Sequence, residues 1–372
     1  MAFTKEYQTF EKKLYYYSAG TLTAERIEEL FEDLLKVLPN GGKLYKYKSL
    51  KSFYVDELEE KYVWFSAAKQ LNDEKDCRFN ANGFREAESL LKFLLTGDNP
   101  RKYLVDSLYR EFSQKNSNIT PKIIEDCLAC VSKNGQKIAK LKFDKFCKEY
   151  QLTAEQKKDL EVGCRLYNNE AQNKEAIKNS IGNICKTIET VRDSMQILSL
   201  TTAYDKDSLW AYYCGNEGLC IEYDFSKIQS IELKRKFLGT QKVRYGKKKK
   251  FRYVDVIKAQ MEETQESKAK ADDMILSQLL TKEKSWKAEE EWRVIGNMVD
   301  NYIGTRIYAD IISAIYLDYS IIRRKKARMI IRLAQENNWP IYIRYFDKYE
   351  AEYRYDTIEN IRKLIRRYRK VE

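Results

Sequence analysis

The stretch KEKSWKAEEEWRVI, residues 282–295, decides whether the later half of this chain contains a buried strand or one more helix. Read as a strand, it places Glu289, Glu291 and Arg293 on one face. Trp292 then points to the opposite face and packs in the core. Two carboxylates at alternate positions beside an arginine can bind ribose hydroxyls and stabilise a cationic sugar transition state. Read as a helix, Glu289 and Arg293 form only an ion pair on a solvated face, and the pattern alone leaves both readings open.

Strand signals occur on both sides of a long helical block. Strands are predicted at residues 43–47, 62–66, 196–201, 219–223, 242–245, 290–296, 305–308, 312–318 and 341–345. Helices are predicted within residues 4–38 and at residues 49–60, 251–282 and 357–369. From residue 84 to residue 192 the chain is charged, helix-periodic and almost free of strand signals. We therefore expect an α+β fold, with one mixed β-sheet core, a large all-helical insertion and helical termini.

The same pattern predicts the domain organisation. Residues 1–42 should form N-terminal helices, and residues 43–82 and 193–318 should form a split α+β core that holds the active site. Residues 83–192 should form the helical insertion. Residues 319–372 should form a basic helix-strand-helix end.

Composition excludes several chemistries. The 372 residues include 68 basic and 56 acidic side chains, eight cysteines and no histidine. Without histidine there can be no Ser-His-Asp or Cys-His triad and no histidine-bound zinc, so catalysis must use carboxylates, lysine, tyrosine, serine or cysteine. The cysteines are scattered, which predicts reduced thiols rather than a disulfide framework. A signal-peptide core and a long apolar run are both missing from the sequence, which predicts a cytoplasmic protein without membrane partners.

A second candidate region lies near the start of the predicted core. Alternation along LYKYKSL, residues 44–50, places Lys46 on one strand face and Tyr47 on the other. The next strand ends at Ser66. Asn72 and Asp73 follow in a polar loop, where they could bind a ligand or simply bond to their own backbone in a turn.

The third candidate region is SLWAYYCGNEGLCIEYDF, residues 208–225. A short helix capped by Asp207 and Ser208 would carry Trp210 and Tyr213 towards a glycine-rich turn. Such aromatic side chains could stack on a nucleobase, but they could equally be core residues.

Together these stretches resemble the bacterial domain-of-unknown-function family numbered 2971. The family pattern includes a Tyr-Lys/His-Tyr strand, a Phe-Asn-Asp-Pro-x-Asp loop, a Trp-x-His-Tyr segment running into Gly-x-Cys-Ile-x-Tyr/Phe-Asp, and a late Lys-x-x-x-Trp-x-x-Glu-x-Glu-Trp/Tyr-Arg. These elements match Tyr45 to Tyr47, Leu71 to Asp73 with Asp76, Trp210 with Tyr213, Gly218 to Asp224, Lys282, Trp286, Glu289 and Glu291 to Arg293. The resemblance spans residues 43–80 and 195–296.

Two positions depart from the family pattern. Glu74 replaces a usual proline, and Tyr212 stands where the family often has histidine. If that histidine is essential, this copy would be altered or inactive. The strand-helix-strand opening and the late Glu-x-Glu strand also resemble, at the level of fold, ADP-ribosyltransferases, which implies NAD as substrate.

This resemblance implies an ADP-ribosyltransferase-like or NAD-cleaving enzyme, with a toxin or a phage-defence effector as possible settings. In this hypothesis Glu291 bonds the nicotinamide ribose, and Glu289 orients an acceptor. Arg293 pairs with these glutamates or meets a phosphate. The remaining residues expected to line the NAD site are Lys46, Tyr47, Ser66, Asn72, Asp73, Trp210 and Tyr213.

Two other functions remain open from the sequence. Residues 320–372 hold 15 basic against 7 acidic side chains, which is typical of a non-catalytic nucleic-acid-binding or regulatory protein. The basic residues that would contact nucleic acid are Arg323, Arg324, Lys325, Lys326, Arg366 and Arg367. A metal nuclease would use carboxylates, namely Asp73, Asp76, Glu289 and Glu291.

Overall fold

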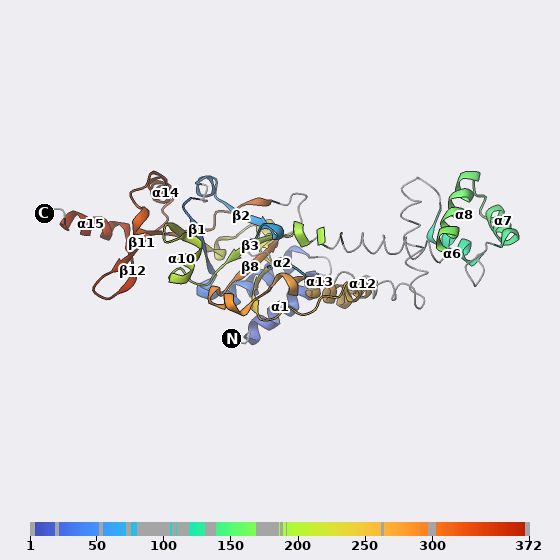
Figure 1. Ribbon diagram of the computed structural model, residues 1–372, viewed down its shortest axis with the longest axis horizontal. Coiled ribbons are helices and arrows are strands. Elements are labelled where there is room, and N and C mark those ends of the chain that lie inside the picture. The colour runs from blue at the N-terminus through green and yellow to red at the C-terminus, as the bar shows by residue number, and fades with distance from the viewer. Residues whose placement is uncertain are drawn as a thin grey trace. The chain divides into compact units, whose positions relative to one another are not determined.

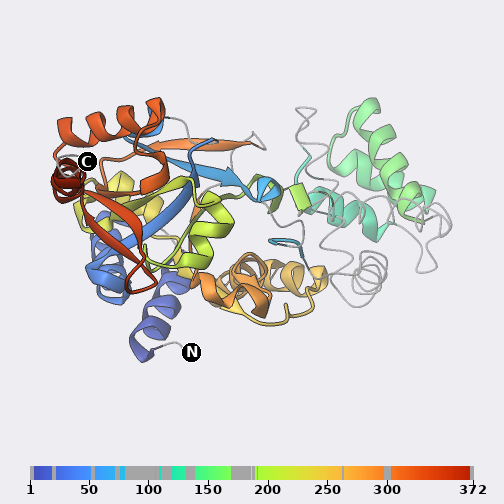
Figure 2. The ribbon, with the colours of Figure 1, turned by 60° about the vertical axis from the view of Figure 1, so that its left-hand side comes forward.

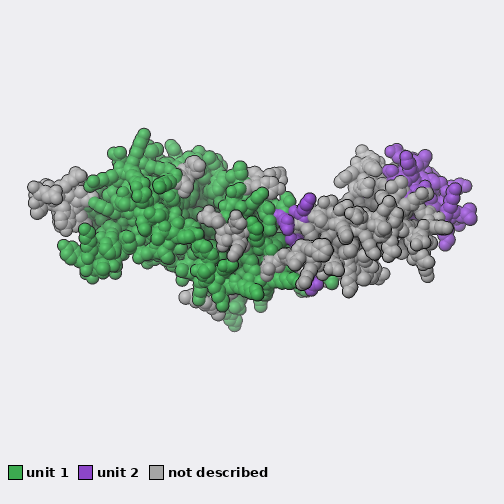
Figure 3. Space-filling model, in the orientation of Figure 1, with its two compact units in different colours: residues 1–80, 190–251, 258–372 green, residues 81–189, 252–257 purple. Residues whose placement is uncertain are grey.

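The computed structural model describes residues 4–18, 22–51, 55–71, 76–79, 105, 109, 119–130, 139–168, 186, 189–190, 192–261, 264–296 and 303–368. The chain divides into two compact units (Figure 3). Unit 1 contains residues 1–80, 190–251 and 258–372, and unit 2 contains residues 81–189 and 252–257.

Within the described part of unit 1, the longer strands form two five-stranded sheets (Figure 1). Sheet A is mixed, because β10 and β11 run parallel whereas its other neighbours are antiparallel. Its order is β1 (Lys43–Ser49), β4 (Gly218–Asp224), β10 (Ile312–Asp318), β11 (Ile341–Asp347) and β12 (Glu352–Thr357). Sheet B is antiparallel. Its order is β5 (Thr240–Lys242), β8 (Trp292–Gly296), β3 (Gln196–Leu200), β2 (Tyr62–Ala67) and β9 (Gly304–Tyr308).

The α+β class is confirmed, but the prediction of a single mixed sheet was wrong. Strands from before and after the helical block do share sheets, since β1 pairs with β4 and β2 pairs with β3. They are divided between two sheets. Although β1 and β2 are close in sequence, β1 belongs to sheet A and β2 belongs to sheet B. A short parallel pair, β6 (Arg244–Tyr245) and β7 (Thr281–Lys282), is separate from both.

Helices cover the sheets of unit 1 (Figures 1 and 2). These are α1 (Lys5–Ser18), α2 (Ala24–Val37), α3 (Asp56–Glu59), α10 (Asp207–Cys214), α11 (Ile231–Phe237), α13 (Gln265–Leu279), α14 (Lys325–Glu336) and α15 (Ile358–Tyr368). The 3₁₀ turns are η1 (Pro39–Gly41), η2 (Ala68–Gln70), η3 (Phe225–Lys227), η4 (Lys284–Glu289) and η5 (Tyr319–Ile321). The start of α2 shows how the sequence sets these elements, since the Thr23 side chain accepts the Arg26 N–H and caps the helix.

The main core lies between the two sheets. Sheet A contributes Leu44 and Ile221, and sheet B contributes Leu198 and Val294. The other face of sheet A carries an aromatic cluster under α10, and the other face of sheet B packs against α13 through Leu279. Each sheet therefore has two apolar faces, which leaves polar side chains to gather at the junction between the sheets.

Several predicted element boundaries were wrong. The strand from Lys43 continues to Ser49, where a helix was expected, because it pairs with β4 along its whole length. Gly218 permits this close pairing, since a Cβ there would overlap the backbone oxygen of Lys48. The helix expected over residues 251–282 is divided into α12 (Tyr253–Met261) and α13, with Thr264 capping the second helix. Strand β12 was not predicted.

The described part of unit 2 is helical. It contains α6 (Pro121–Ala129), α7 (Lys140–Glu149) and α8 (Ala154–Asn168), which pack around their own core. Cys127 and Cys130 are buried in this core. Pro121 opens α6 behind the Thr120 cap, which matches the helix-start chemistry of the sequence.

Candidate active site

The candidate site lies where sheet A meets sheet B. Tyr45 of β1 forms a β-bridge with Thr201, just beyond the end of β3. One residue further along β1, the Lys46 amine donates to the backbone oxygen of Ser199 at 2.9 Å. Two cavities adjoin here, of about 150 Å³ and about 60 Å³. The residues that line both cavities are Lys46, Ser199, Tyr213 and Glu291.

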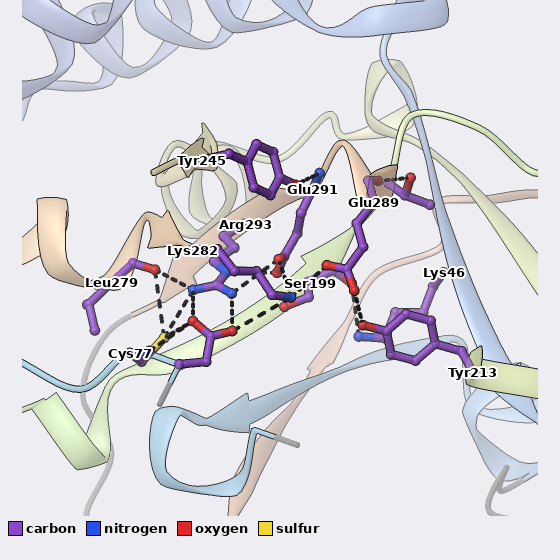
Figure 4. Close-up of polar contacts among 12 residues, drawn as sticks. Lys46, Cys77, Ser199, Tyr213, Tyr245, Leu279, Lys282, Glu289, Glu291 and Arg293 are labelled. Carbon is purple, nitrogen blue, oxygen red and sulfur yellow. Dashed lines mark hydrogen bonds and ion pairs between the residues drawn. The ribbon is translucent and has the colours of Figure 1, made fainter. Parts of the chain in front are cut away.

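A fully buried arginine organises one side of the larger cavity (Figure 4). The Arg293 Nε donates to Oε1 of Glu291 at 2.7 Å, and its Nη1 donates to Oδ1 of Asp76 at 3.1 Å. Nη1 also donates to the backbone oxygen of Leu279, at the end of α13. Because all three nitrogens of the guanidinium are occupied, Arg293 orients the two carboxylates and has no surface for a phosphate.

Lys282 links the same carboxylates to a third one. Its amine donates to Oε2 of Glu289 at 2.6 Å and to Oε2 of Glu291 at 3.0 Å. Lys282 lies in β7 rather than at the end of a helix, because β7 pairs with β6. We call Asp76, Lys282, Glu289, Glu291 and Arg293 the Arg293 network. It contains three carboxylates and two cations, so one negative charge remains uncompensated within it.

The backbone around Glu290 explains why both flanking glutamates reach this network. Glu289 ends the 3₁₀ turn η4, and Glu290 has a left-handed conformation with φ 47°. The strand β8 begins only at Trp292. The predicted strand over residues 290–296 therefore started too early, and a kink rather than strand alternation brings Glu289 beside Glu291. Trp292 is buried, as the alternation predicted.

Hydrogen bonds hold each glutamate in place. The Glu291 N–H donates to the Tyr245 hydroxyl at 2.7 Å, and the Ser199 side chain bonds to its carboxylate. The Tyr213 hydroxyl donates to Oε1 of Glu289 at 2.5 Å. The Thr201 hydroxyl donates to the Glu289 backbone oxygen at 2.5 Å. These contacts come from β6, from α10 and from β3 with its flanking residue Thr201, so the geometry depends on three separate segments of unit 1.

The environment separates the acidities of the two glutamates. Burial opposes ionisation of Glu291, but the charges of Arg293 and Lys282 outweigh it and lower the pKa of Glu291 to about 2. Burial raises the pKa of Glu289 above its usual value, although Lys282 and Tyr213 oppose that change. Glu291 therefore stays ionised at neutral pH, whereas Glu289 takes up a proton more readily than Glu291 does.

Aromatic side chains form one wall of the larger cavity. Tyr212 and Trp286 meet edge to face, with ring centroids 5.1 Å apart, and Tyr212 meets Tyr213 at 4.9 Å. The Lys282 amine lies 5.0 Å from the Trp286 ring centroid. Tyr212 is 59% exposed, so its ring is available to a ligand. A cavity with aromatic walls and a few fixed polar groups suits a small ring-containing ligand.

The structure brings together most of the residues expected at the site. Lys46, Ser66 and Glu291 line the larger cavity, and Tyr47 lines the smaller one. Asn72 and Asp73 lie outside the described residues.

For Arg293 the structure shows the first of the two expected roles, because its guanidinium pairs with Glu291. The expectation that Trp210 contacts a ligand was wrong. Trp210 is fully buried, and its indole N–H donates to the Tyr204 backbone oxygen at 2.8 Å, so it is a core residue rather than a ligand contact. The first turn of α10 also differs from the expected cap, because Asp207 lies inside the helix and binds Arg344.

Sequence reasoning missed Ser199 and Tyr245 and did not assign Lys282 to the site. Lys282 belongs to the same late motif as Trp286 and the glutamates, and this shared motif could have pointed to Lys282 as a site residue. Ser199 and Tyr245 lie in ordinary strand segments and carry no sequence signal. Asp76 was named in the family resemblance and as a metal ligand of the nuclease hypothesis, whereas the structure pairs it with Arg293.

The metal-nuclease hypothesis requires a cluster of carboxylates that can hold a metal ion. Among the residues that the structure describes, no group of three or more acidic or cysteine side chains could hold a metal ion.

Two of the basic C-terminal residues pair with other groups of the protein. Arg324 pairs with Glu217 at 2.7 Å, and the Lys326 amine donates to the Leu50 backbone oxygen at 2.8 Å. Arg323 and Lys325 are exposed. The side chains of Arg366 and Arg367 lie outside the described residues. Nucleic-acid binding stays a prediction.

The fold and the site define an α+β protein with a carboxylate-rich cavity at the junction of two sheets. Residues 209–294 match the family described as "Protein of unknown function (DUF2971)". The matched segment contains Tyr213 and four members of the Arg293 network, and it lies within the second segment for which the resemblance was expected. A search of curated proteins found no match, and a search of solved structures also found none. In the described residues, no helix combines the length and the apolar character needed to cross a membrane.

Proposed function

We propose that this protein cleaves the bond between nicotinamide and ribose in NAD, as a glycohydrolase or an ADP-ribosyltransferase-like enzyme. The observation that carries the proposal is the pair of glutamates with separated acidities on the wall of one cavity. Environments that push apart the pKa values of two neighbouring carboxylates are characteristic of acid and base assignments in active sites.

Glu291 would stabilise the transition state. When the nicotinamide leaves with the bonding electron pair, positive charge develops on the ribose at C1′ and O4′. Glu291 remains anionic because its pKa is about 2, and its carboxylate is held by Arg293 and Lys282 before the substrate binds. Such preorganised charge needs no rearrangement during the reaction, which is the main source of electrostatic catalysis.

Glu289 would act as the base. Nicotinamide leaves as a neutral molecule and needs no proton, whereas the incoming nucleophile must lose one. A carboxylate with a raised pKa accepts that proton more readily than Glu291 does. The Tyr213 hydroxyl and the Lys282 amine orient Glu289, so its carboxylate is fixed at the smaller cavity.

The cavities limit how much of NAD can be enclosed. Their volumes of about 150 Å³ and about 60 Å³ lie below the roughly 300–1,000 Å³ typical of pockets for drug-sized ligands. We therefore place the nicotinamide and its ribose inside, beside the Tyr212 and Trp286 rings. The adenosine half would extend out of the cavities.

The test measures nicotinamide release from NAD by the full-length protein and by Glu291→Gln. We expect release by the wild type and its loss in the variant, because the substitution removes the charge that opposes the developing cation. The same substitution should also destabilise unit 1, because a neutral amide at this position would leave Arg293 and Lys282 with less compensation in a buried site.

A matched control separates lost chemistry from lost stability. Asp318 pairs with a second buried arginine, Arg344, at 2.9 Å. Asp318→Asn should also destabilise unit 1 but should retain nicotinamide release below its melting temperature. Equal loss of release in both variants, or wild-type protein that leaves NAD intact, would contradict the proposal. Free ADP-ribose as the product would assign a glycohydrolase, and ADP-ribose attached to an added acceptor would assign a transferase.

A further inference from the structure

Lys46 and Lys282 both line the larger cavity, but the surroundings of their amines differ. The Lys282 amine touches Glu289, Glu291 and, at 3.8 Å, Asp76. Although burial opposes its charge, the carboxylates raise the pKa of Lys282 above its usual value. Lys282 is therefore a fixed cation, whose amine cannot act as a nucleophile.

Lys46 is placed differently. It lines both cavities, and its amine donates to the neutral backbone oxygen of Ser199. Burial, followed by the charge of Lys48, lowers the pKa of Lys46 to about 8. The charged groups that act on its amine are Lys48, Glu57, Glu291 and Arg293. As the pH approaches 8, a growing fraction of this amine is uncharged, and the uncharged amine has a free lone pair inside the cavity.

We propose that Lys46 is the nucleophile of the reaction and forms a covalent bond to C1′ of the nicotinamide ribose. This inference rests on the proposed function, because it requires NAD in the cavity. It adds a catalytic residue and a covalent intermediate to that function. Lys46 and Glu291 line the same two cavities, so a ribose held against Glu291 lies beside the amine.

The reaction balances with groups already at the site. The Lys46 lone pair forms the C1′–Nζ bond while the bond from C1′ to the nicotinamide nitrogen breaks, and neutral nicotinamide leaves with that electron pair. The new ammonium gives one proton to the Glu289 carboxylate. Glu289 then returns this proton to O4′ as the C1′–O4′ bond breaks, which leaves a protonated imine between Lys46 and the open sugar. Water adds to the imine and releases ADP-ribose, which restores the amine.

Other nucleophiles of the cavity region fit less well. Lys48 lies on the same face of β1, but its amine pairs with the buried carboxylate of Glu57. Ser66 lines only the larger cavity, whereas Glu289 lines the smaller one. Lys46 lines both cavities, so Glu291 can stabilise the cation beside its amine and Glu289 can accept its proton.

The experiment traps the imine. Full-length protein is incubated with NAD and sodium cyanoborohydride, which reduces an imine to a stable secondary amine, and released nicotinamide is measured in parallel. Mass spectrometry of the digested protein should find an added, reduced ADP-ribosyl group on Lys46. Trapping should increase as the pH rises through about 8, because the amine must be uncharged to attack.

Two variants control this experiment. Lys46→Arg keeps the positive charge but cannot form an imine, so it should show neither the adduct nor nicotinamide release. Lys48→Arg is the matched control on the same strand face, and it should retain both. Circular dichroism establishes that each variant is folded, and the adduct site on the wild-type protein does not depend on either variant.

The outcomes separate this inference from the proposed function. An adduct on Lys46 supports the covalent intermediate. Nicotinamide release without an adduct on Lys46, or with an adduct on another residue only, overturns the role of Lys46 and leaves NAD cleavage standing. Wild-type protein that releases no nicotinamide overturns both.

Discussion

In the part of unit 1 that the structure describes, two arginines are buried, and they are used in different ways. Arg293 and Arg344 are 0% and 1% exposed. Arg293 binds buried carboxylates that line a cavity. Arg344 binds Asp318 and Asp207, but the Asp207 side chain is 62% exposed. We call these three residues the Arg344 network.

The surroundings of the two guanidinium groups explain this difference. The Arg344 guanidinium carbon lies 3.3 Å from the ring centroid of Tyr353 and 5.1 Å from that of Trp210. Its faces are thus covered by aromatic rings, and it ties α10 to sheet A. Arg293 instead holds the carboxylates of Glu291 and Asp76, which line the larger cavity. A buried ion pair therefore indicates a site only where its partners also border open space.

The largest expected effect compares Arg293→Met with Arg344→Met. The first change leaves the carboxylates of Glu291 and Asp76 buried with fewer partners and should cost about 3–5 kcal/mol in the free energy of unfolding. The second change should cost about 1–3 kcal/mol, because Asp207 is already exposed and only Asp318 loses a buried donor. Urea unfolding of both variants measures the difference. Equal costs, or a larger cost for Arg344→Met, would contradict the stated difference between the two buried arginines.

The next effect is a dependence of stability on acid. The pKa of Glu291 is about 2 in the folded protein, compared with an ordinary value of 4.5. Because the folded value is lowered, its stabilising contribution is complete above 4.5 and is lost as the pH falls towards 2. Melting temperatures measured between neutral pH and about pH 3 should fall less steeply for Glu291→Gln than for the wild type. Asp318→Asn, in the Arg344 network, should keep the wild-type contribution of Glu291. An unchanged slope in Glu291→Gln would show that Glu291 is not held as an anion.

The smallest effects concern two neighbours on α10. Trp210→Phe should cost about 1–2 kcal/mol, because it removes the indole N–H donated to Tyr204 and contact with Arg344. Tyr213→Phe should cost about 0.5–1.5 kcal/mol, the net worth of its hydrogen bond to Glu289. Only Tyr213→Phe should also shift the acid limb of nicotinamide release to higher pH, because losing this donor raises the pKa of Glu289 further. A shift of the same size in Trp210→Phe would place that residue in the site as well.

Local sequence patterns predicted much of the fold. The alternation of β1 correctly separated Lys46 from Tyr47, and the strand character of residues 292–296 correctly buried Trp292. These predictions succeeded because the two faces of a strand meet different environments, and side-chain polarity records that difference. The sequence of a strand does not show which other strand it pairs with, so two sheets were predicted as one.

The candidate site was only partly predictable for the same reason. Glu289, Glu291 and Lys46 stood out as charged residues in or beside strands. The kink at Glu290, which carries an uncommon positive φ in a non-glycine residue, could not be read from three consecutive glutamates. Ser199 and Tyr245 reach Glu291 only through strand pairing and packing, so their sequence context gave no indication of their role.

The sequence by itself determined the classes of chemistry available here. It contains no histidine, it carries a late group of glutamates, and its strands place lysine and tyrosine on opposite faces. Only the tertiary structure decided which carboxylate stays ionised and which lysine can lose its proton. Those properties depend on burial and on charges a few ångströms away, and the residues that supply them, such as Asp76 and Arg293, are separated by more than two hundred positions in the chain.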